Sequence, residues 1–600
     1  MRDRGYLSCT PRSDFLPVGR WQRILYTDLV LPYRRKARLQ PLKRDLSELS
    51  NKEYDLLVIG GGINGVCTAW DAALRGLSVA LVEKGDFGEA TSSATLRVVH
   101  GGLRYLQHLD LPRMRQSIRE RTILMRIAPH LVSPLPFLIP TYGHGKEGME
   151  VLAAAMFVND LISYDRNQLD DPGKFIPNGR VISQYRCRRI LPGVDQRRLT
   201  GGAIFYDAQM HNSERLTLSF ARAAAEAGAD LANYAEVVGF SLDGRRVRRA
   251  RVADVLTGEE FEIRAKVFAN ATGPWSDIVL GLLRYRPPDR TVVRSKGIQI
   301  VAPLLCDTYA FGIPSRQRDV EAIFRRGRRL LFVTPWRGRS LIGTTDVVYR
   351  GDPDDFAVTE RDIAEFVAEI NAAYPGASLR REDISFWYGG LRPITEETIQ
   401  RDVSRASRKY EICDHAGTDR IQGLISVVGV KYTTCRFLAQ KVVDLVFTKL
   451  RYRRPPRTLT RRKPVFGGNI ERLHDFTRRA VRDKPDRIRE NVIRHLVRNY
   501  GSEYPRVLRY VEENARWAQL VPGSVEVLKA EIVHGVREEM ACRLTDVVMR
   551  RTDLGCLGHP GEEALRACAD IMAPELGWDR QRKDEELNRA RMVFVPGGGK

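Results

Sequence analysis

The chain has 600 residues and a mass of 68.1 kDa, enough for several domains and a large core that needs no disulfide support. Its 43% hydrophobic and 28% charged content, with a mean hydropathy of −0.32, exclude a polytopic membrane protein and a disordered chain. Lys and Arg (97) outnumber Asp and Glu (74), and the formal net charge of +23 favours anionic partners such as nucleic acid, acidic lipid or a phosphorylated metabolite.

The nine cysteines are scattered and show no C-x-x-C spacing. They therefore indicate neither a disulfide framework nor a zinc site, we expect no metal, and a reducing compartment is the simplest interpretation. No run of about 18 apolar residues occurs, so we expect no membrane-spanning helix. Residues 1–50 form a basic N-terminal extension without the apolar run of a secretory signal, and a mitochondrial transit peptide is the less favoured alternative.

The first regular elements expected in the chain form a βαβ unit. Tyr54–Ile59 is a short β-rich run that stops at a glycine, as a strand buried on both faces of a parallel sheet would. A helical pattern follows from Ile63 to Arg75, and a second apolar strand runs from Leu77 to Val82.

A glycine-rich turn joins this first strand to this helix. Gly60, Gly62 and Gly65 satisfy G-x-G-x-x-G, in which the glycines permit a tight turn, approach to a pyrophosphate and close helix–strand packing. Glu83 lies where an acidic residue takes the adenosine ribose hydroxyls, and a solvated strand-end carboxylate is the alternative. After Glu83 the chain enters a loop of small residues, 85–93, and later strands rejoin the same sheet only much further along the sequence. This favours FAD over NAD, because the long segment in between can cover an extended cofactor.

Later elements continue the α/β pattern. Buried strands are expected at Lys266–Ala271 and Leu424–Gly429, and a mostly antiparallel sheet between residues 291 and 388. Beyond Pro455–Pro456 the chain reads as helical and basic. Further helical patterns occur at Leu111–Pro129, Met149–Tyr164, Thr359–Tyr374 and Thr434–Leu450.

Several sequence stretches are specific in combination. They are HGGLRYL from His100, IGTTD from Ile342, and LRP from Leu391 together with RRTDLG from Arg550; further matching stretches include GGLRPI from Gly389 and VVGVKYTTCR from Val427. Through them, and through similarity from Tyr54 to beyond Leu554, the chain resembles the flavin-dependent glycerol-3-phosphate dehydrogenases of the glutathione-reductase-like FAD superfamily. This resemblance implies oxidation of sn-glycerol 3-phosphate to dihydroxyacetone phosphate by hydride transfer from C2 to flavin N5, with the electrons passed to a quinone.

The same resemblance implies an α/β fold with three folded parts after the extension. These are a Rossmann-like FAD-binding domain of glutathione-reductase type, an inserted antiparallel β-sheet substrate domain and an all-α C-terminal domain. The expected boundaries are 51–130, 200–290 and 389–450 for the FAD-binding domain, 131–199 and 291–388 for the substrate domain, and 456–590 for the helical domain.

The resemblance implies that the segment with His100, Arg104 and Tyr105 lies beside the flavin and the substrate, and the chemistry of alcohol oxidation suggests what the candidate residues do. His100 is the best general base, because imidazole accepts a proton near neutral pH, and a hydrogen bond to flavin or backbone is the alternative role. Lys431 is placed to stabilise charge on the flavin's pyrimidine side. Arginine suits a doubly charged phosphate ester. The expected substrate-binding residues are Arg104, Tyr105, Thr345, Arg392 and Arg408, with Arg392 also counted as catalytic.

The residues expected to bind the cofactor gather around the glycine-rich turn and the strand ends beside it. They are Gly60, Gly62, Asn64, Gly65, Glu83, Lys84, Thr91, Ser92, Ser93, Ala271, Thr272, Gly273, Gly429 and Lys431. Several positions depart from the family pattern and put the exact substrate in question. They are Ala94, Leu96, Arg97, Val430 and Cys435.

Without a spanning helix, contact with a membrane quinone requires docking at the lipid surface. Met149–Tyr164 together with Leu131–Pro140, or the extension around Trp21 with its basic cluster, combines apolar side chains with positive charge. The expected location is the inner face of the cytoplasmic membrane, with an anionic lipid surface as partner. A homodimer is an open option.

Three other functions stay open from the sequence. The first is an FAD-dependent oxidase or dehydrogenase of another polyol phosphate, a 2-hydroxy acid or an amine. The second is a nucleic-acid-binding protein, which the charge alone would allow but no recognised RNA or DNA motif supports, so nucleic acid is not an expected partner. The third is a catalytically silent scaffold.

Overall fold

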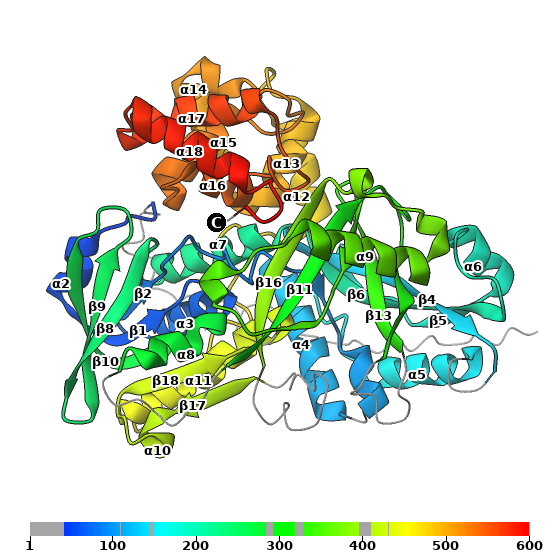
Figure 1. Ribbon diagram of the computed structural model, residues 1–600, viewed down its shortest axis with the longest axis horizontal. Helices are drawn as coiled ribbons and strands as arrows, with labels where there is room; N and C mark the ends of the chain where they lie inside the picture. Colours follow the sequence, from blue (N-terminus) through cyan, green and yellow to red (C-terminus); the bar gives the residue numbers. More distant parts are fainter. Residues whose placement is uncertain are drawn as a thin grey trace, which may run out of the picture. The chain divides into compact units, whose positions relative to one another are not determined.

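The structure is a computed structural model that describes residues 41–108, 110–144, 148–283, 292–318, 328–394, 410–429 and 431–598. Most of the predicted extension, residues 1–40, lies outside the described residues. Two sheets and a set of C-terminal helices make up the described part (Figure 1).

The first sheet is mixed and has parallel strands at its centre. Its main path runs β17 (Glu411–Asp414), β18 (Leu424–Val428), β10 (Glu260–Asn270), β1 (Glu53–Ile59), β2 (Val79–Val82) and β7 (Asp230–Ala232). Strands from β18 to β7 pair in parallel, whereas β17 and the hairpin of β8 (Ala235–Asp243) and β9 (Arg246–Asp254) pair antiparallel. The predicted strand–helix–strand unit is confirmed as β1, α3 (Ile63–Leu74) and β2.

Apolar side chains on both faces of this sheet bury it between two layers. One core cluster joins it to helices that include α3, α4 (Leu111–Ile127), α7 (Ser213–Glu226) and α11 (Cys435–Lys449). The other face packs against the β8–β9 hairpin, α2 (Leu46–Asn51) and α8 (Ser276–Gly281). Burial on both faces explains why β1 reads as a continuous apolar run rather than an alternating one.

The second sheet is largely antiparallel, as predicted for residues 291–388. Its path runs β15 (Val347–Tyr349), β11 (Val293–Ala302), β14 (Arg339–Gly343), β13 (Arg328–Trp336), β12 (Ala310–Arg318), β4 (Val132–Tyr142), β6 (Leu199–Met210) and β3 (Val98–Val99). β16 (Phe386–Ile394) pairs with β11, and β5 (Arg180–Ser183) pairs with β6. The predicted helix at 359–374 is confirmed as α9 (Glu360–Ala373), which packs on this sheet beside α6 (Gln184–Ile190).

The proline-punctuated stretch Leu131–Pro140 is not the surface docking segment that we predicted. It forms β4, which lies between β6 and β12 and buries Leu135, Phe137 and Leu138. Its prolines occupy alternate positions, so their missing N–H groups lie on one edge of the strand. The other edge pairs with β6 along its length, whereas β12 pairs with β4 over only two positions.

Helix α5 (Met149–Ile162) is confirmed, but its apolar residues do not share one face. Met156 is buried against β4 and β6. Leu161 is 67% exposed, because the five residues that separate it from Met156 along the helix turn its side chain by about 140°. Phe157 and Tyr164 are also exposed, at 72% and 76%.

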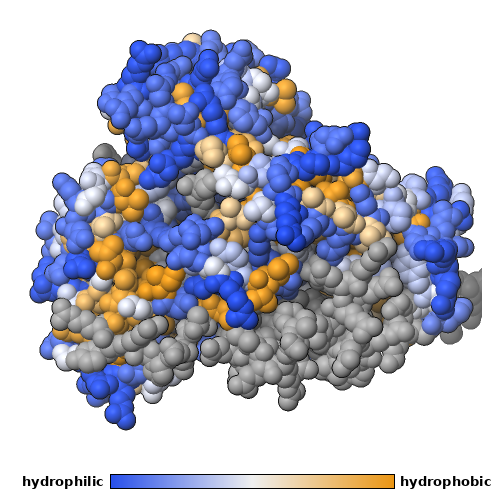
Figure 2. All heavy atoms as spheres, viewed as in Figure 1, coloured by the Kyte–Doolittle hydropathy of each residue, from blue (hydrophilic) through white to orange (hydrophobic). Residues whose placement is uncertain are grey.

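The C-terminal helices enclose a separate apolar core. They are α12 (Leu473–Arg482), α13 (Glu490–Tyr500), α14 (Tyr504–Glu513), α15 (Lys529–Glu539), α16 (Leu544–Asp546), α17 (Glu562–Leu576) and α18 (Arg580–Met592). The face of these helices seen in Figure 2 is predominantly hydrophilic. In the described part of the chain no helix combines the length and apolar character that crossing a bilayer requires.

Candidate active site

One large cavity lies where the two sheets meet. Its volume is about 2830 Å³, and its wall includes the strand ends Ile59, Val82 and Ala271 of the first sheet. Phe205, Gln299, Phe332, Gly343 and Arg392 of the second sheet also line it. A cavity of this size is roughly three times the upper end of the usual range for small-ligand pockets, which suits an extended cofactor together with a substrate.

The glycine-rich turn opens one end of this cavity. Gly60 has a φ of +108°, and a Cβ on Gly65 would lie 1.9 Å from the carbonyl oxygen of Gly60. The turn therefore depends on glycine both for its backbone conformation and for the close crossing of α3 over β1. Gly62, the N-cap of α3, has no side chain to cap the helix and lines the cavity with Gly60, so the positive end of α3 faces the cavity.

Glu83 and Ser92 brace this turn through the backbone. The Glu83 carboxylate accepts hydrogen bonds from the N–H groups of Gly61 at 2.5 Å and Gly85 at 2.8 Å. Burial raises the pKa of Glu83 despite these bonds. The Ser92 hydroxyl accepts from the N–H of Ile63 at 2.9 Å.

Asn64 provides a test of whether the wall fits a dinucleotide. Its Oδ1 atom is buried and has no hydrogen-bond partner among the described residues. A Cβ on Gly429, which faces it across the cavity wall, would lie 2.2 Å from the Asn64 Nδ2 atom. Gly429 therefore lets Asn64 pack against the backbone of the wall, and the orphaned Asn64 oxygen is an atom that a polar cofactor edge would satisfy, so the residues present fit FAD.

Most of the predicted cofactor residues line the cavity, and two do not. Those that line it are Gly60, Gly62, Asn64, Glu83, Lys84, Thr91, Ser92, Ala271, Thr272, Gly273, Gly429 and Lys431. Gly65 serves helix–strand packing, and the Ser93 hydroxyl donates to the carbonyl oxygens of Glu89 and Ala90. Lys84 pairs with Asp354 at 2.5 Å.

His100 forms a pair with a carboxylate that sequence reasoning missed. Its Nδ1 atom lies 3.1 Å from Asp207 Oδ2, and its side chain is 47% exposed on the cavity wall. Asp207 is buried and also accepts hydrogen bonds from Gly101 N–H at 2.6 Å and Arg121 Nη1 at 2.8 Å. Burial acts to raise the pKa of Asp207, but the bonds and charges of His100 and Arg121 outweigh it and leave this pKa lowered.

The Asp207 contact determines which histidine nitrogen is available for chemistry. An ionised carboxylate at Nδ1 favours the tautomer with the proton on that atom and leaves Nε2 as an acceptor. The signal that could have found Asp207 is an isolated acidic residue in the apolar run 203–208 of β6.

Arg392 and Lys431 place positive charge on the same cavity wall. Arg392 Nη2 lies 3.2 Å from Asp346 Oδ1, and Asp346 in turn accepts a hydrogen bond from Ser295. Lys431 Nζ lies 3.9 Å from the ring centre of Tyr105, and both residues line the cavity. The two cations are thus held at defined positions on the wall of the cavity that His100 also lines.

The other predicted substrate residues are distributed differently. Thr345 is not part of the cavity wall, because its hydroxyl accepts a hydrogen bond from Ile298 N–H at 2.9 Å. Thr344 and Asp346 line the cavity instead. Arg408 and the side chain of Arg104 lie outside the described residues.

The departures from the family pattern lie partly behind the cavity. Ala94 and Leu96 line it, whereas Arg97 is buried beneath it with a φ of +57°. The Arg97 guanidinium donates to both carboxylate oxygens of Glu214 and lies 4.3 Å from the Trp336 ring centre. Cys435 contacts Cys67 with 3.6 Å between sulfurs, and Val430 lies outside the described residues.

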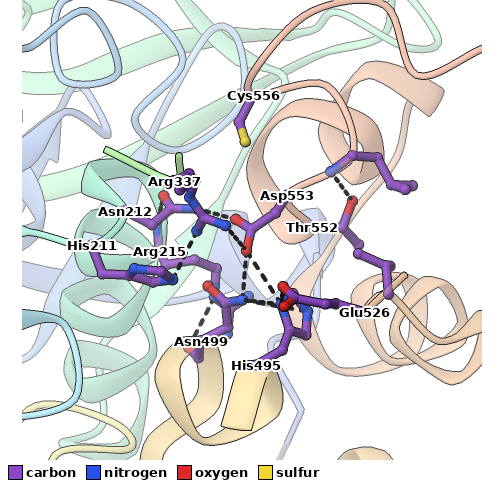
Figure 3. Close-up of polar contacts among 12 residues, drawn as sticks. His211, Asn212, Arg215, Arg337, His495, Asn499, Glu526, Thr552, Asp553 and Cys556 are labelled. Atoms are coloured by element: carbon purple, nitrogen blue, oxygen red, sulfur yellow. Dashed lines mark hydrogen bonds and ion pairs between the residues drawn. The ribbon is translucent and has the colours of Figure 1, made fainter. Parts of the chain in front are cut away.

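A buried polar network joins the second sheet to the C-terminal helices (Figure 3). Arg337, at the tip of the β13–β14 hairpin, lies 2.8 Å from His211 Nε2 and 2.7 Å from Asp553 Oδ2. Burial acts to raise the pKa of Asp553, but the charges of Arg337 and His495 hold it well below its usual range. Burial acts to lower the pKa of His495, and nearby carboxylates, Glu531 first, raise it to about 10.

Comparisons with known proteins identify the family. Residues 55–423 match the FAD dependent oxidoreductase family, and residues 458–583 match the C-terminal domain of alpha-glycerophosphate oxidase. A glycerol-3-phosphate dehydrogenase of Synechocystis is 34% identical over 91% of this chain and 97% of its own length. The chain belongs to the FAD-dependent glycerol-3-phosphate dehydrogenase family.

Two further relatives support this assignment. Glycerol-3-phosphate dehydrogenase 2 of Mycobacterium tuberculosis is 32% identical over 92% of this chain and 90% of its own length. The crystal structure of glycerol-3-phosphate dehydrogenase from Bacillus halodurans, complexed with FAD, matches with a TM-score of 0.70 at 26% identity, over 91% of this chain and 96% of that one. The predicted family, the α/β FAD-binding fold and FAD as the cofactor are therefore confirmed.

Proposed function

We propose that this protein oxidises sn-glycerol 3-phosphate to dihydroxyacetone phosphate and passes the electrons to a membrane quinone. The names of its relatives support this substrate. The observation that carries the proposal is the presence of the His100–Asp207 pair, Arg392 and Lys431 on the wall of the cavity that begins at the glycine-rich turn.

In this proposal the chain's own residues bind the substrate and move its proton. Arg392 binds the phosphate, with Arg104 and Arg408 as further ligands from the sequence. His100 Nε2 accepts the proton of the C2 hydroxyl, and Asp207 stabilises the resulting imidazolium. Bound FAD supplies the hydride acceptor. Lys431 stabilises the negative charge that develops beside it.

The deciding experiment is an anaerobic reduction of the purified holoenzyme. Addition of glycerol 3-phosphate without oxygen is expected to bleach the visible flavin bands, because bound FAD would be the acceptor of the two electrons lost by the substrate. Equal concentrations of glycerol, a 2-hydroxy acid and a primary amine are the comparison substrates. Bleaching by one of these, with none by glycerol 3-phosphate, would assign the enzyme to another substrate.

Arg392→Ala is expected to raise KM for glycerol 3-phosphate about 10- to 100-fold. The reason is the loss of a charged hydrogen bond, worth about 1.5–3 kcal/mol, to the substrate phosphate. Steady-state rates with a quinone analogue measure the change. Arg188→Ala, an exposed arginine on α6, is the matched control. An Arg392→Ala enzyme with the KM of the control would exclude this arginine as the phosphate ligand.

The electron acceptor has a second candidate. The match of the C-terminal helices to a domain of alpha-glycerophosphate oxidase favours oxygen as the alternative to quinone. Hydrogen peroxide released in air at one molecule per substrate oxidised would assign an oxidase. Reduction of a quinone analogue with little peroxide is the result that we expect.

Helix α5 is the proposed docking element at the inner face of the cytoplasmic membrane. Its side chains Phe157 and Leu161 are 72% and 67% exposed, and Tyr164, two residues beyond its end, is 76% exposed, while Met156 on its other side lines the cavity. Exposed apolar side chains of this kind suit a helix lying in the bilayer surface, and docking through them would bring the cavity close to the lipid that contains the quinone.

The double variant Phe157→Ser/Leu161→Ser is expected to bind anionic phospholipid vesicles at least tenfold more weakly. Each lost apolar side chain removes roughly 1.5–3 kcal/mol of burial. Co-sedimentation at fixed salt measures binding. Tyr185→Ser, a 71% exposed position on α6, is the control. Equal binding of the double variant and this control would move the docking surface away from α5.

A further inference from the structure

A compact cluster of ligand-type side chains lies at the outer edge of the first sheet, away from the residues that line the cavity. It consists of Cys413 on β17, His415 at the start of α10 (His415–Thr418) and Asp419 directly after it. One ligand atom from each residue lies within 4.8 Å of the other two. The spacing of the cysteines predicted no metal site. The three side chains come together because the chain turns back between β17 and β18.

Two of the ligand atoms lie close to the third, which is the Nδ1 nitrogen of His415. His415 Nδ1 lies 2.5 Å from Asp419 Oδ2 and 4.0 Å from Cys413 Sγ. His415 is 1% exposed and Cys413 is 9% exposed. Ligand bonds of about 2.0–2.3 Å in a tetrahedral zinc site put neighbouring ligand atoms roughly 3.2–3.7 Å apart, so adjustments of about 1 Å would bring all three into coordination.

The second histidine nitrogen has the partner that a metal-binding imidazole requires. His415 Nε2 lies 2.8 Å from the hydroxyl of Ser426, which is buried on β18 and pairs directly with Cys413 across the two strands. A hydrogen bond at the far nitrogen fixes the ring orientation and the tautomer that leaves Nδ1 free for a metal. The arrangement therefore contains both the ligands and their support.

We propose that Cys413, His415 and Asp419 bind one zinc ion. A thiolate, an imidazole and a carboxylate form a mixed S, N, O set that suits Zn²⁺, whereas Mg²⁺ and Ca²⁺ prefer oxygen ligands alone. The thiolate and the carboxylate balance the charge of the ion, so the buried site is neutral overall. The exposed Thr418, whose hydroxyl lies 3.5 Å from Cys413 Sγ, marks the side on which water completes the coordination.

The ion would act on the shape of the active site rather than on the reaction. It joins His415 and Asp419, in the turn after β17, to Cys413 on β17, the strand that pairs with β18. β18 in turn leads directly to Gly429 and Lys431 on the cavity wall. Tying the turn to the sheet would limit movement of the segment that presents the lysine. The bound metal is therefore structural, and its loss would loosen that segment without removing a reacting group.

Metal content of the full-length holoenzyme tests the proposal. The protein is produced with Zn²⁺ in the medium, purified without chelator under reducing conditions, and analysed by mass spectrometry of the metal. About one zinc per chain is expected, with less than about 0.2 in Cys413→Ser and in Asp419→Asn. Cys306→Ser, a partly exposed cysteine outside the cluster, should keep the metal.

A second measurement separates metal binding from loss of folding in the variants. Chelator-stripped wild-type protein is titrated with Co²⁺, and a thiolate-to-cobalt charge-transfer band should appear and saturate at one equivalent. The band should be absent in Asp419→Asn protein that retains its flavin spectrum. Either of two results would overturn the proposal: the same low zinc content in wild type and Cys413→Ser, or no cobalt band in stripped wild type. The three side chains would then form only a hydrogen-bonded network.

Discussion

Replacing Asp207 with asparagine is expected to lower the rate of flavin reduction about 100- to 10,000-fold while FAD stays bound. The asparagine amide can donate to His100 Nδ1, which would favour the tautomer with the proton on Nε2 and remove the acceptor. It would also leave the imidazolium formed in the reaction without its carboxylate partner. Anaerobic stopped-flow mixing with glycerol 3-phosphate measures the rate.

The control for this variant is Asp243→Asn, the same change at an exposed position in the β8–β9 hairpin. It should reduce its flavin at the wild-type rate. If Asp207→Asn reduces its flavin within threefold of that rate, His100 binds flavin or backbone without acting as the base.

Gly65→Ala is expected to lower the FAD content of the purified protein at least tenfold and to destabilise the fold. The added Cβ would lie 1.9 Å from the carbonyl oxygen of Gly60, so β1 and α3 must separate. Overpacking of this kind costs about 1–3 kcal/mol, and the shift also moves the N-terminus of α3 that faces the cavity. The absorbance ratio of flavin to protein and the thermal midpoint measure both effects.

Gly281→Ala is the matched control, since a Cβ there meets no atom within 4 Å. It adds the same methyl group in α8 and should leave both FAD content and thermal midpoint close to wild type. Full flavin occupancy in Gly65→Ala would show that the close crossing of β1 and α3 is not required for binding.

The first βαβ unit could be predicted because its signals are local. The apolar run before Gly60, the helical pattern after it and the acidic residue at 83 each depend on neighbours in the sequence. The same holds for the segment around Lys431, which follows a buried strand and precedes a helix. Gly60, Glu83 and Lys431 could therefore be predicted from the sequence, and all three line the cavity.

Contacts between distant residues were not predictable in the same way. His100 and Asp207 are 107 positions apart and meet only because β3 pairs with β6. Thr345 was expected at the substrate, but in the segment between β14 and β15 its neighbours Thr344 and Asp346 line the cavity, and the sequence alone does not say which of these consecutive residues faces it. The prolines of β4 suggested a surface segment. A strand tolerates them when it pairs mainly along one edge, and that pairing depends on β6, which is distant in the sequence.

The buried ion pairs between the C-terminal helices and the rest of the chain restrict how this protein could be divided. Arg551 lies against Asp86, which follows β2, and Arg215 of α7 lies against Glu539 of α15, with all four side chains almost fully buried. Removing one member of such a pair leaves a charge without compensation, at about 3–5 kcal/mol each. A version of this chain ending near residue 450 would lose both Glu539 and Arg551 and expose the interface in which Arg215 and Asp86 are buried, so a simple deletion is expected to destabilise the part that remains.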